Sequence, residues 1–233
     1  MRRRNSKPEM PENTENPFAM STGDLMAGLL FIFVLLLSYA LLQVQEKAES
    51  DEQIVGEYNR IKTQLYIDLE SEFKEDLKIW NAVLDSVDLS VRFQEPSTLF
   101  DYDSYTLKKK FKDILDDFFP RYIQILSHSN YIDNIQEIRI EGHTDSKGSY
   151  FYNMRLSQDR TRSVLEYCMS LDPLLNKREW IMSKVTANGL SFSQPIKSGE
   201  AVNDELSRRV EFRIRTNAEK QLENIITKRK ATS

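Results

Sequence analysis

One stretch near the beginning of the chain decides its architecture: Phe18-Ala-Met-Ser-Thr-Gly-Asp-Leu-Met-Ala-Gly-Leu-Leu-Phe-Ile-Phe-Val-Leu-Leu-Leu-Ser-Tyr-Ala-Leu-Leu42. From Leu25 to Leu42 only Ser38 is clearly polar, and about 20 helical residues of this kind cross the hydrocarbon core of a bilayer. We therefore predict a transmembrane helix over residues 18–43. Asp24 is the only charged residue in the quoted stretch. An ionisable group inside a membrane span costs at least about 2.5 kcal/mol, and such groups typically handle ions or protons.

The residues around Asp24 allow two interpretations of its position. Ser21-Thr22-Gly23-Asp24 resembles a helix start, in which Ser21 is the N-cap and Asp24 stabilises the positive end of the helix dipole. Alternatively, the helix starts near Pro17 and Phe18, so that Asp24 lies about one turn inside and is protected by partner helices. These residues alone leave both interpretations open.

The charges on either side of the span predict its orientation. Basic residues precede it, at Arg2, Arg3, Arg4 and Lys7. Acidic residues follow it, at Glu46, Glu49, Asp51 and Glu52. The positive-inside rule places residues 1–17 in the cytoplasm as a tail and predicts that the chain after about Gln43 is exported, so we predict a single-pass membrane protein. A cleavable signal peptide also begins with basic residues, but its apolar region is about 7–15 residues long, which favours a retained anchor.

The composition excludes several classes of protein. The 233 residues carry a net charge of −4, which does not indicate nucleic acid as a partner. The single cysteine, Cys168, cannot form an intramolecular disulfide, and we expect it on a buried helix face. His128 and His143 have no zinc-type spacing with this cysteine, so we assign no metal. Phosphate-binding loops and His-Glu-x-x-His motifs are absent from the sequence, so we do not expect an enzyme.

Residues 44–85 are predicted to form a periplasmic helical connector. Apolar residues recur there at spacings of three or four, at Ile54, Tyr58, Ile61, Leu65, Leu69, Phe73, Leu77 and Trp80. This apolar stripe needs a partner, which is either the same helix of a second copy or the following domain. The first steps of the stripe have the 4-3-4 spacing of a coiled-coil seam, which is compatible with a dimer.

Residues 86–217 alternate between strand and helix patterns. We expect strands at 87–93, 135–142, 184–189 and 209–215, and helices at 105–126 and 152–171. Pro120 is expected to kink or end the first of these helices. The order of elements predicts a compact α/β sandwich with helices on one face of the sheet. Residues 218–233 are expected to form a basic C-terminal tail.

A set of motif residues in this region carries a family resemblance. They are Thr144-Asp145, Gly148, Asn153, Leu156-Ser157, Arg160 and Arg208-Arg209-Val210-Glu211. The segment from about Val87 to Thr216 thereby resembles the OmpA-like peptidoglycan-binding domain, which has a TD-x-x-G turn, then N-x-x-L-S-x-x-R, and later R-R-V-E. The fold class implied is an OmpA-like α/β sandwich domain that follows a single N-terminal transmembrane helix and a helical connector.

The resemblance also implies a ligand and the residues that hold it. Asp145 and Arg160 would clamp the zwitterionic end of diaminopimelate in a peptidoglycan stem peptide, because a carboxylate suits its ammonium and a guanidinium suits its carboxylate. The pocket would be lined by Thr144, Tyr152, Asn153 and Leu156, with Arg209 as a nearby candidate. Without the resemblance, Asp145 and Arg160 would be an ordinary surface pair worth about 0–1 kcal/mol. His143 stands beside Asp145 but has no nucleophile placed to complete a triad, so we treat it as a strand-end residue.

The order of segments resembles a second family. A short basic tail, one span with an aspartate on its N-terminal side, a helical connector and a peptidoglycan clamp are similar to the B subunits of ion-driven stator motors, the MotB family. The segment Gly23-Asp24-Leu25-Met26-Ala27-Gly28-Leu29 looks more like the B subunit of the Zorya anti-phage defence system than a flagellar stator, because it lacks the preceding tryptophan and the phenylalanine after the aspartate.

This second resemblance implies a location, partners and an ion. The chain would be a single-pass protein of the bacterial inner membrane, with its N-terminus in the cytoplasm and its C-terminal domain in the periplasm. Two copies of the span would sit within a MotA-like membrane pentamer, which is the A subunit (ZorA) in the Zorya case. Asp24 would then be alternately protonated and released as the ion carrier. No bound cofactor is expected, and the translocated ion is a proton or, alternatively, sodium. Two other functions stay open at this point: a flagellar-type MotB stator subunit, and a passive envelope tether that binds peptidoglycan.

Overall fold

The computed structural model describes residues 17–94, 99–101, 103–217, 219–220, 222–223 and 226–227, and among them the side chains of 17–21, 23 and 24 lie outside the description. The chain divides into two compact units, Met1–Glu52 and Gln53–Ser233. The first helix, α1 (Pro17–Ile79), contributes to both units. Of the predicted tails, residues 1–16 and most of 218–233 fall outside the described residues.

The described part of the first unit is helical throughout. Its apolar side chains from Leu25 to Val44 are exposed. Within the described ranges, α1 is the one helix long and apolar enough to cross a membrane. Asp24 belongs to this helix, which begins at Pro17 and therefore starts before Ser21.

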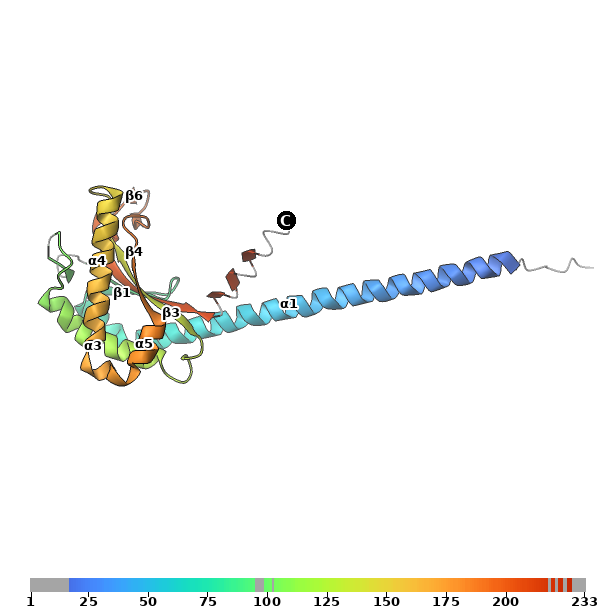
Figure 1. The fold of residues 1–233 in the computed structure, drawn as a ribbon, viewed down its shortest axis with the longest axis horizontal. Coiled ribbons are helices and arrows are strands. Elements are labelled where there is room, and N and C mark those ends of the chain that lie inside the picture. The colour runs from blue at the N-terminus through green and yellow to red at the C-terminus, as the bar shows by residue number, and fades with distance from the viewer. Residues whose placement is uncertain are drawn as a thin grey trace, which may run out of the picture. The chain divides into compact units, whose positions relative to one another are not determined.

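The second unit is built on a five-stranded sheet (Figure 1). Its strands are β1 (Ala82–Asp85), β2 (Ser90–Phe93), β3 (Ile135–His143), β4 (Val185–Gly189) and β7 (Arg209–Thr216). Their order across the sheet is β1-β2-β7-β3-β4, in which only β3 and β4 run parallel. A separate small hairpin joins β5 (Lys197–Ser198) to β6 (Ala201–Val202).

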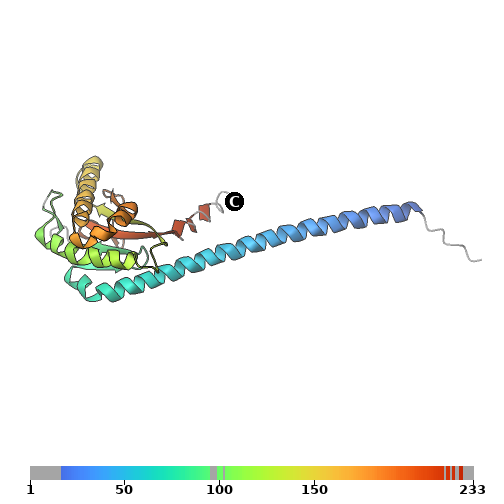
Figure 2. The same cartoon turned by 60° about the horizontal axis from the view of Figure 1, so that its bottom comes forward.

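The remaining elements are helical, and the larger ones cover one face of the sheet. They are α3 (Lys109–Leu126), α4 (Tyr150–Met169), the 3-10 helix η1 (Asp172–Lys177), α5 (Arg178–Lys184) and α6 (Asp204–Ser207). Figure 2 shows α3 lying along the C-terminal part of α1. Cys168 is fully buried on α4, as the sequence predicts.

The core lies between these helices and the sheet, because apolar and polar side chains alternate along the strands and therefore point to opposite faces. In β7, Val210, Phe212 and Ile214 are buried and apolar, whereas Arg209, Glu211 and Arg213 point to the opposite face. Phe118 of α3 sits at the centre, with its ring centroid 5.1 Å from that of Phe212. The rings of Phe93 in β2 and Phe73 in α1 lie 5.1 and 5.3 Å from the same ring. Aromatic packing therefore joins α1, α3 and the sheet.

The apolar stripe of α1 finds its partner in this core. From Ile61 to Trp80 the stripe residues are buried, whereas Ile54 and Tyr58 are only half-buried. Arg121 of α3 fixes the contact, because its guanidinium forms ion pairs with Glu72 and Asp76 of α1 at 2.7 and 2.9 Å. The following domain thus covers the later part of the stripe, and the predicted dimer remains untested.

Helix α3 ends at Leu126, as predicted, but it begins at Lys109 and not at Tyr105, and Pro120 lies inside it without ending it. Tyr122, Ile123 and Leu126 are fully buried, and their packing offsets the backbone hydrogen bond that a proline removes. Strand β1 also falls within residues 44–85, which were expected to be helical. It is only four residues long and pairs with β2 from Ala82↔Phe93 to Asp85↔Ser90.

Gly189 allows β4 to approach α4 closely, and its replacement should destabilise the domain. A Cβ at this position would lie 2.4 Å from the backbone nitrogen of Gln158, so Gly189→Ala should lower the free energy of unfolding by about 1–3 kcal/mol. Gly56→Ala is the matched control, because a Cβ there meets nothing within 4 Å and alanine favours a helix by about 1 kcal/mol. Thermal unfolding followed by the fluorescence of Trp80 and Trp180 measures both. Equal stability of the two variants would contradict this account of the β4–α4 contact.

Candidate functional site

The predicted clamp residues line one cavity at the end of β3. It has a volume of about 520 Å³. Its walls come from the turn after β3, the first turns of α4, the segment before α3 and the residue before β7. The lining residues are Phe100, Asp101, Asp103, Lys108, Thr144, Asp145, Lys147, Tyr152, Asn153, Leu156, Arg160 and Arg208.

The turn after β3 holds Asp145 in a fixed position. Its Oδ1 accepts a hydrogen bond from the backbone N–H of Lys147 at 3.1 Å. Gly148 follows with φ +91°, a conformation that favours glycine. The side-chain amide of Asn153 donates to the carbonyl of Lys147 at 2.7 Å and ties the turn to α4. Ser149 caps α4 by accepting from the N–H of Tyr152 at 3.2 Å.

Asp145 already has a charged partner in the cavity. Its Oδ2 accepts from Nη1 of Arg208 at 2.8 Å, and the Asp145 side chain is only 13% exposed. The guanidinium of Arg208 therefore neutralises this carboxylate. An ammonium group that binds Asp145 must share this carboxylate with Arg208 or displace the guanidinium.

Arg160 supplies a second cation from α4. Its Nε donates to the carbonyl of Ser104 at 2.9 Å, and its guanidinium lies over the ring of Phe100, 4.9 Å from the centroid. Burial lowers the pKa of Arg160, while Asp103 and Asp145 act in the opposite direction, and an arginine remains a cation at neutral pH. Within the described residues no side chain accepts a hydrogen bond from its terminal nitrogens, so these donors can face a ligand.

Thr144 adds an unpaired polar group to the cavity wall. Its N–H donates to the carbonyl of Ser191 at 2.9 Å, which fixes the backbone. Its hydroxyl is buried and has no hydrogen-bond partner among the described residues. Buried hydroxyls are normally paired, so Thr144 is an exception in this wall.

The structure brings together all the predicted clamp residues except Arg209. Thr144, Asp145, Tyr152, Asn153, Leu156 and Arg160 line the cavity. Arg209 is the first residue of β7 and belongs to the opposite face of the sheet, whereas its neighbour Arg208 reaches the cavity. Successive side chains of β7 point to opposite faces of the sheet, so Arg209 shares a face with Glu211 and not with Val210. This alternation could have distinguished Arg209 from Arg208 in the sequence. Asp24 is placed only as part of α1, since its side chain lies outside the described residues.

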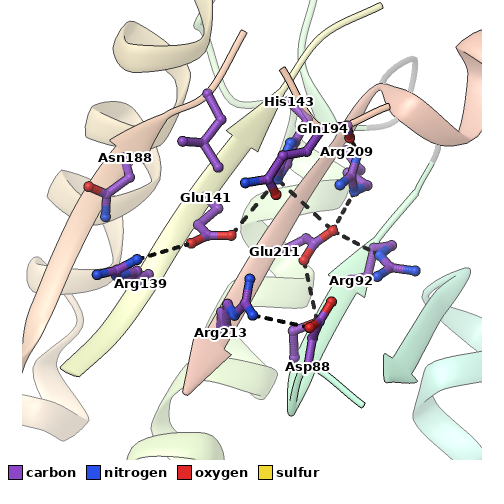
Figure 3. Close-up of polar contacts among 12 residues, drawn as sticks. Asp88, Arg92, Arg139, Glu141, His143, Asn188, Gln194, Arg209, Glu211 and Arg213 are labelled. Atoms are coloured by element: carbon purple, nitrogen blue, oxygen red, sulfur yellow. Dashed lines mark hydrogen bonds and ion pairs between the residues drawn. The ribbon is translucent and has the colours of Figure 1, made fainter. Parts of the chain in front are cut away.

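A charged layer covers the sheet face that is turned away from the helices (Figure 3). At its centre, Glu211 accepts hydrogen bonds from Arg209 and, at 2.9 Å, from Arg92. His143 Nε2 lies 4.0 Å from Oε2 of Glu141 and 4.0 Å from Oε1 of Glu211. Burial would raise the pKa of Glu211, but its ion pairs with Arg209 and Arg92 hold it at about 2. Burial and the surrounding guanidinium groups lower the pKa of His143 to about 3, so this imidazole is neutral.

The same layer contains a group of residues that could hold a metal by geometry alone. The donor atoms of Glu141, His143 and Glu211 lie within 4.8 Å of one another. The charges oppose a divalent cation there, because Glu211 already pairs with two guanidinium groups and Arg139 and Arg213 flank the carboxylates (Figure 3). We therefore interpret the layer as structural, and the absence of a metal remains a prediction.

Comparison with known proteins relates the chain to two groups. Residues 99–209 match the OmpA family. The chain is 40% identical to Zorya protein ZorB of Escherichia coli (strain Crooks) over 224 residues, which cover 92% of this chain and 94% of that protein. Zorya protein ZorB of Escherichia coli O139:H28 is 29% identical over 89% of this chain and 84% of its own length. Among solved structures, a putative MotB-like protein from Desulfovibrio vulgaris is 21% identical, covers 66% of this chain and 91% of its own, and has a TM-score of 0.45.

His143 should make the stability of the domain sensitive to mild acid. The unfolded imidazole takes up a proton near pH 6.5, whereas the folded one does so only near pH 3. Between these values the unfolded state binds more protons, so the free energy of unfolding should fall by about 2 kcal/mol from pH 6.5 to pH 5. Denaturant unfolding at several pH values measures this slope.

The variant His143→Gln should flatten the slope in this window. His128→Gln is the matched control, because this histidine is exposed, and it should retain the wild-type slope. A slope that persists in His143→Gln would show that another group binds the proton.

Proposed function

The chain belongs to the Zorya protein ZorB family, and we propose that it is the peptidoglycan-anchored stator subunit of a proton-driven inner-membrane motor in anti-phage defence. The observation that carries the anchoring role is the cavity in which Asp145, Arg160 and Arg208 converge. The ion-carrying role is supported by the single apolar helix that contains Asp24. Neither role requires this chain to catalyse a reaction.

The cavity suits a zwitterion better than a ligand of one charge. Asp145 is paired with Arg208, so a lone cation at Asp145 would leave Arg208 without its partner, and a lone anion at Arg160 would make no use of Asp145. The end of a diaminopimelate side chain carries both an ammonium and a carboxylate. The ammonium can bind Asp145 while the carboxylate binds Arg160 and Arg208, which leaves every charge paired. Thr144 offers a hydroxyl to the same ligand, and Leu156 and Tyr152 provide the apolar contact for its methylene groups.

The helical connector transmits the anchoring force. The later part of α1 is packed into the core of the domain at Leu65, Leu69 and Phe73, and Arg121 adds ion pairs to it. The same helix contains the apolar span. In the proposed function, a domain bound to the cell wall would hold the later part of α1, and the span belongs to the same helix.

In the membrane, Asp24 is the proposed carrier of the proton. Two copies of α1 would sit within a MotA-like pentamer, which supplies the polar environment that an intramembrane carboxylate needs. A carboxylate can bind and release a proton, which is the property that an intramembrane proton carrier requires. Rotation of the pentamer around the anchored dimer would then be available to the defence response. This arrangement places the N-terminus in the cytoplasm and the cavity in the periplasm.

Arg160→Ala should abolish tight binding of the stem peptide. Truncating one partner of a buried charged contact costs about 2–5 kcal/mol, so the dissociation constant should rise at least about 30-fold. The affinity of the full-length protein in detergent for a stem tripeptide ending in diaminopimelate is measured by calorimetry. Arg162→Ala is the matched control, because Arg162 lies on the same helix but its side chain is 60% exposed and pairs with Asp159. Equal affinity of the two variants would refute the cavity as the binding site.

Asp24→Asn should abolish protection against phage while the complex still assembles. Asparagine has nearly the same shape as aspartate but cannot take up and release a proton at neutral pH. Plaque assays report the protection, and the mass of the tagged complex purified in mild detergent reports the assembly with its membrane partner. If the fully assembled variant still protects against phage, Asp24 does not carry the ion. This is the result expected for a passive tether.

A further inference from the structure

Lys147 is a cation of the cavity wall that the proposed zwitterion does not use. The residue lines the cavity and is exposed. Other charges of the wall already have partners. Asp145 pairs with Arg208 at 2.8 Å, and Asp101 pairs with Lys108 at 3.8 Å. Among the residues that the structure describes, no carboxylate forms an ion pair with the ammonium of Lys147.

The described wall therefore carries more positive than negative charge. Its charged residues are the cations Lys108, Lys147, Arg160 and Arg208 and the acids Asp101, Asp103 and Asp145. A zwitterion brings no net charge, so the excess of positive charge remains after its ammonium and its carboxylate are bound. A ligand with a further negative group would complement the wall better.

The backbone holds Lys147 beside the position that the ligand ammonium would take. Its N–H donates to Oδ1 of Asp145 at 3.1 Å, and its carbonyl accepts from the side-chain amide of Asn153 at 2.7 Å. The side chain of a lysine is flexible and extends about 6 Å from the backbone. The ammonium of Lys147 can therefore meet a ligand group within about 9 Å of the Asp145 carboxylate.

The stem peptide carries a second carboxylate at a matching distance. Diaminopimelate follows a glutamate that is joined through its γ-carboxyl group, so the α-carboxylate of this glutamate is free unless the cell converts it to an amide. About ten bonds separate this carboxylate from the zwitterionic end of diaminopimelate, which is about 12 Å in an extended chain and less in a bent one. One ligand can thus reach Asp145 and Lys147 together.

We infer that Lys147 binds the α-carboxylate of the glutamate, and that the cavity thereby prefers stem peptides in which this group is not amidated. The inference rests on the proposed function, because Asp145 must hold the end of diaminopimelate. Lys108 is less suited, since it is already paired with Asp101. The α-carboxyl group of diaminopimelate is also within reach, but it becomes an amide wherever the stem continues. The glutamate carboxylate does not depend on the length of the stem.

Three soluble ligands test the inference. They are the tripeptide of alanine, γ-linked glutamate and diaminopimelate, the same tripeptide with the glutamate α-carboxyl group amidated, and the tetrapeptide in which a further alanine blocks the α-carboxyl group of diaminopimelate. Their affinities for the full-length wild-type protein in detergent are measured by calorimetry. The amidated tripeptide should bind about two- to fivefold more weakly than the other two ligands, which is the range of an exposed ion pair.

Substitutions of Lys147 should change this preference and leave the domain folded, because the hydrogen bonds of Lys147 to Asp145 and Asn153 use its backbone. Lys147→Ala should bind all three ligands with the wild-type affinity for the amidated tripeptide. Lys147→Arg should keep the preference, because it keeps the charge. Lys110→Ala is the matched control. It also removes an exposed lysine, but Lys110 does not line the cavity, so this variant should behave as the wild type.

The outcomes separate this inference from the proposed function. Equal wild-type affinity for the tripeptide and its amidated form, or a preference that survives in Lys147→Ala, would overturn the inference and leave the peptide site intact. Weaker binding of the tetrapeptide alone, abolished by Lys147→Ala, would assign Lys147 to the α-carboxylate of diaminopimelate and would also overturn it. Failure of the wild type to bind any of the three ligands would overturn the proposed function as well.

Discussion

The antiparallel pairing of β3 with β7 is the interaction on which the rest of the domain depends. Its register runs from Ile135↔Thr216 to His143↔Arg209. Because His143 and Arg209 are paired, the chain leaves β3 toward Asp145 at the place where Arg208 enters β7. The ion pair between Asp145 and Arg208 therefore follows from the strand register. A shift of one residue would exchange the two faces of the sheet and separate this pair.

The two faces of these strands have different physical roles. Phe212 and Ile140 belong to an apolar core that includes the later part of α1. On the other face, the charges of Glu211, Arg209 and Arg92 are buried together, and each offsets the desolvation of the others. Burying such a network contributes less stability than apolar packing of the same volume. A wrong strand register, however, would leave buried charges without partners and is therefore strongly unfavourable. The charged layer therefore specifies the pairing on which the cavity depends.

Much of the fold could be predicted from the sequence because its strands and helices have clear periods. The strands ending in Gly142 and Gly189 and the helices that contain Phe118 and Val164 were all recognisable in this way. Strand β1 was missed because its four residues follow a long helical stripe and lack a pattern of their own. The segment around Phe100 gave no periodic signal, so its contribution to the cavity was not foreseen. Arg209 was named as a nearby candidate, whereas Arg208 is the residue that lines the cavity, since a motif records neighbours in sequence and not the face on which each side chain lies.

The ion pair between Asp145 and Arg208 has a consequence for the solution conditions in which the domain works. A zwitterionic ligand brings no net charge, and it exchanges one internal ion pair for two contacts of the same kind. Few counterions are released in such an exchange, so the affinity should depend only weakly on ionic strength, unlike binding that relies on the attraction between oppositely charged surfaces. In the proposed function, a grip on the cell wall that depends little on screening would persist when the salt concentration around the domain changes.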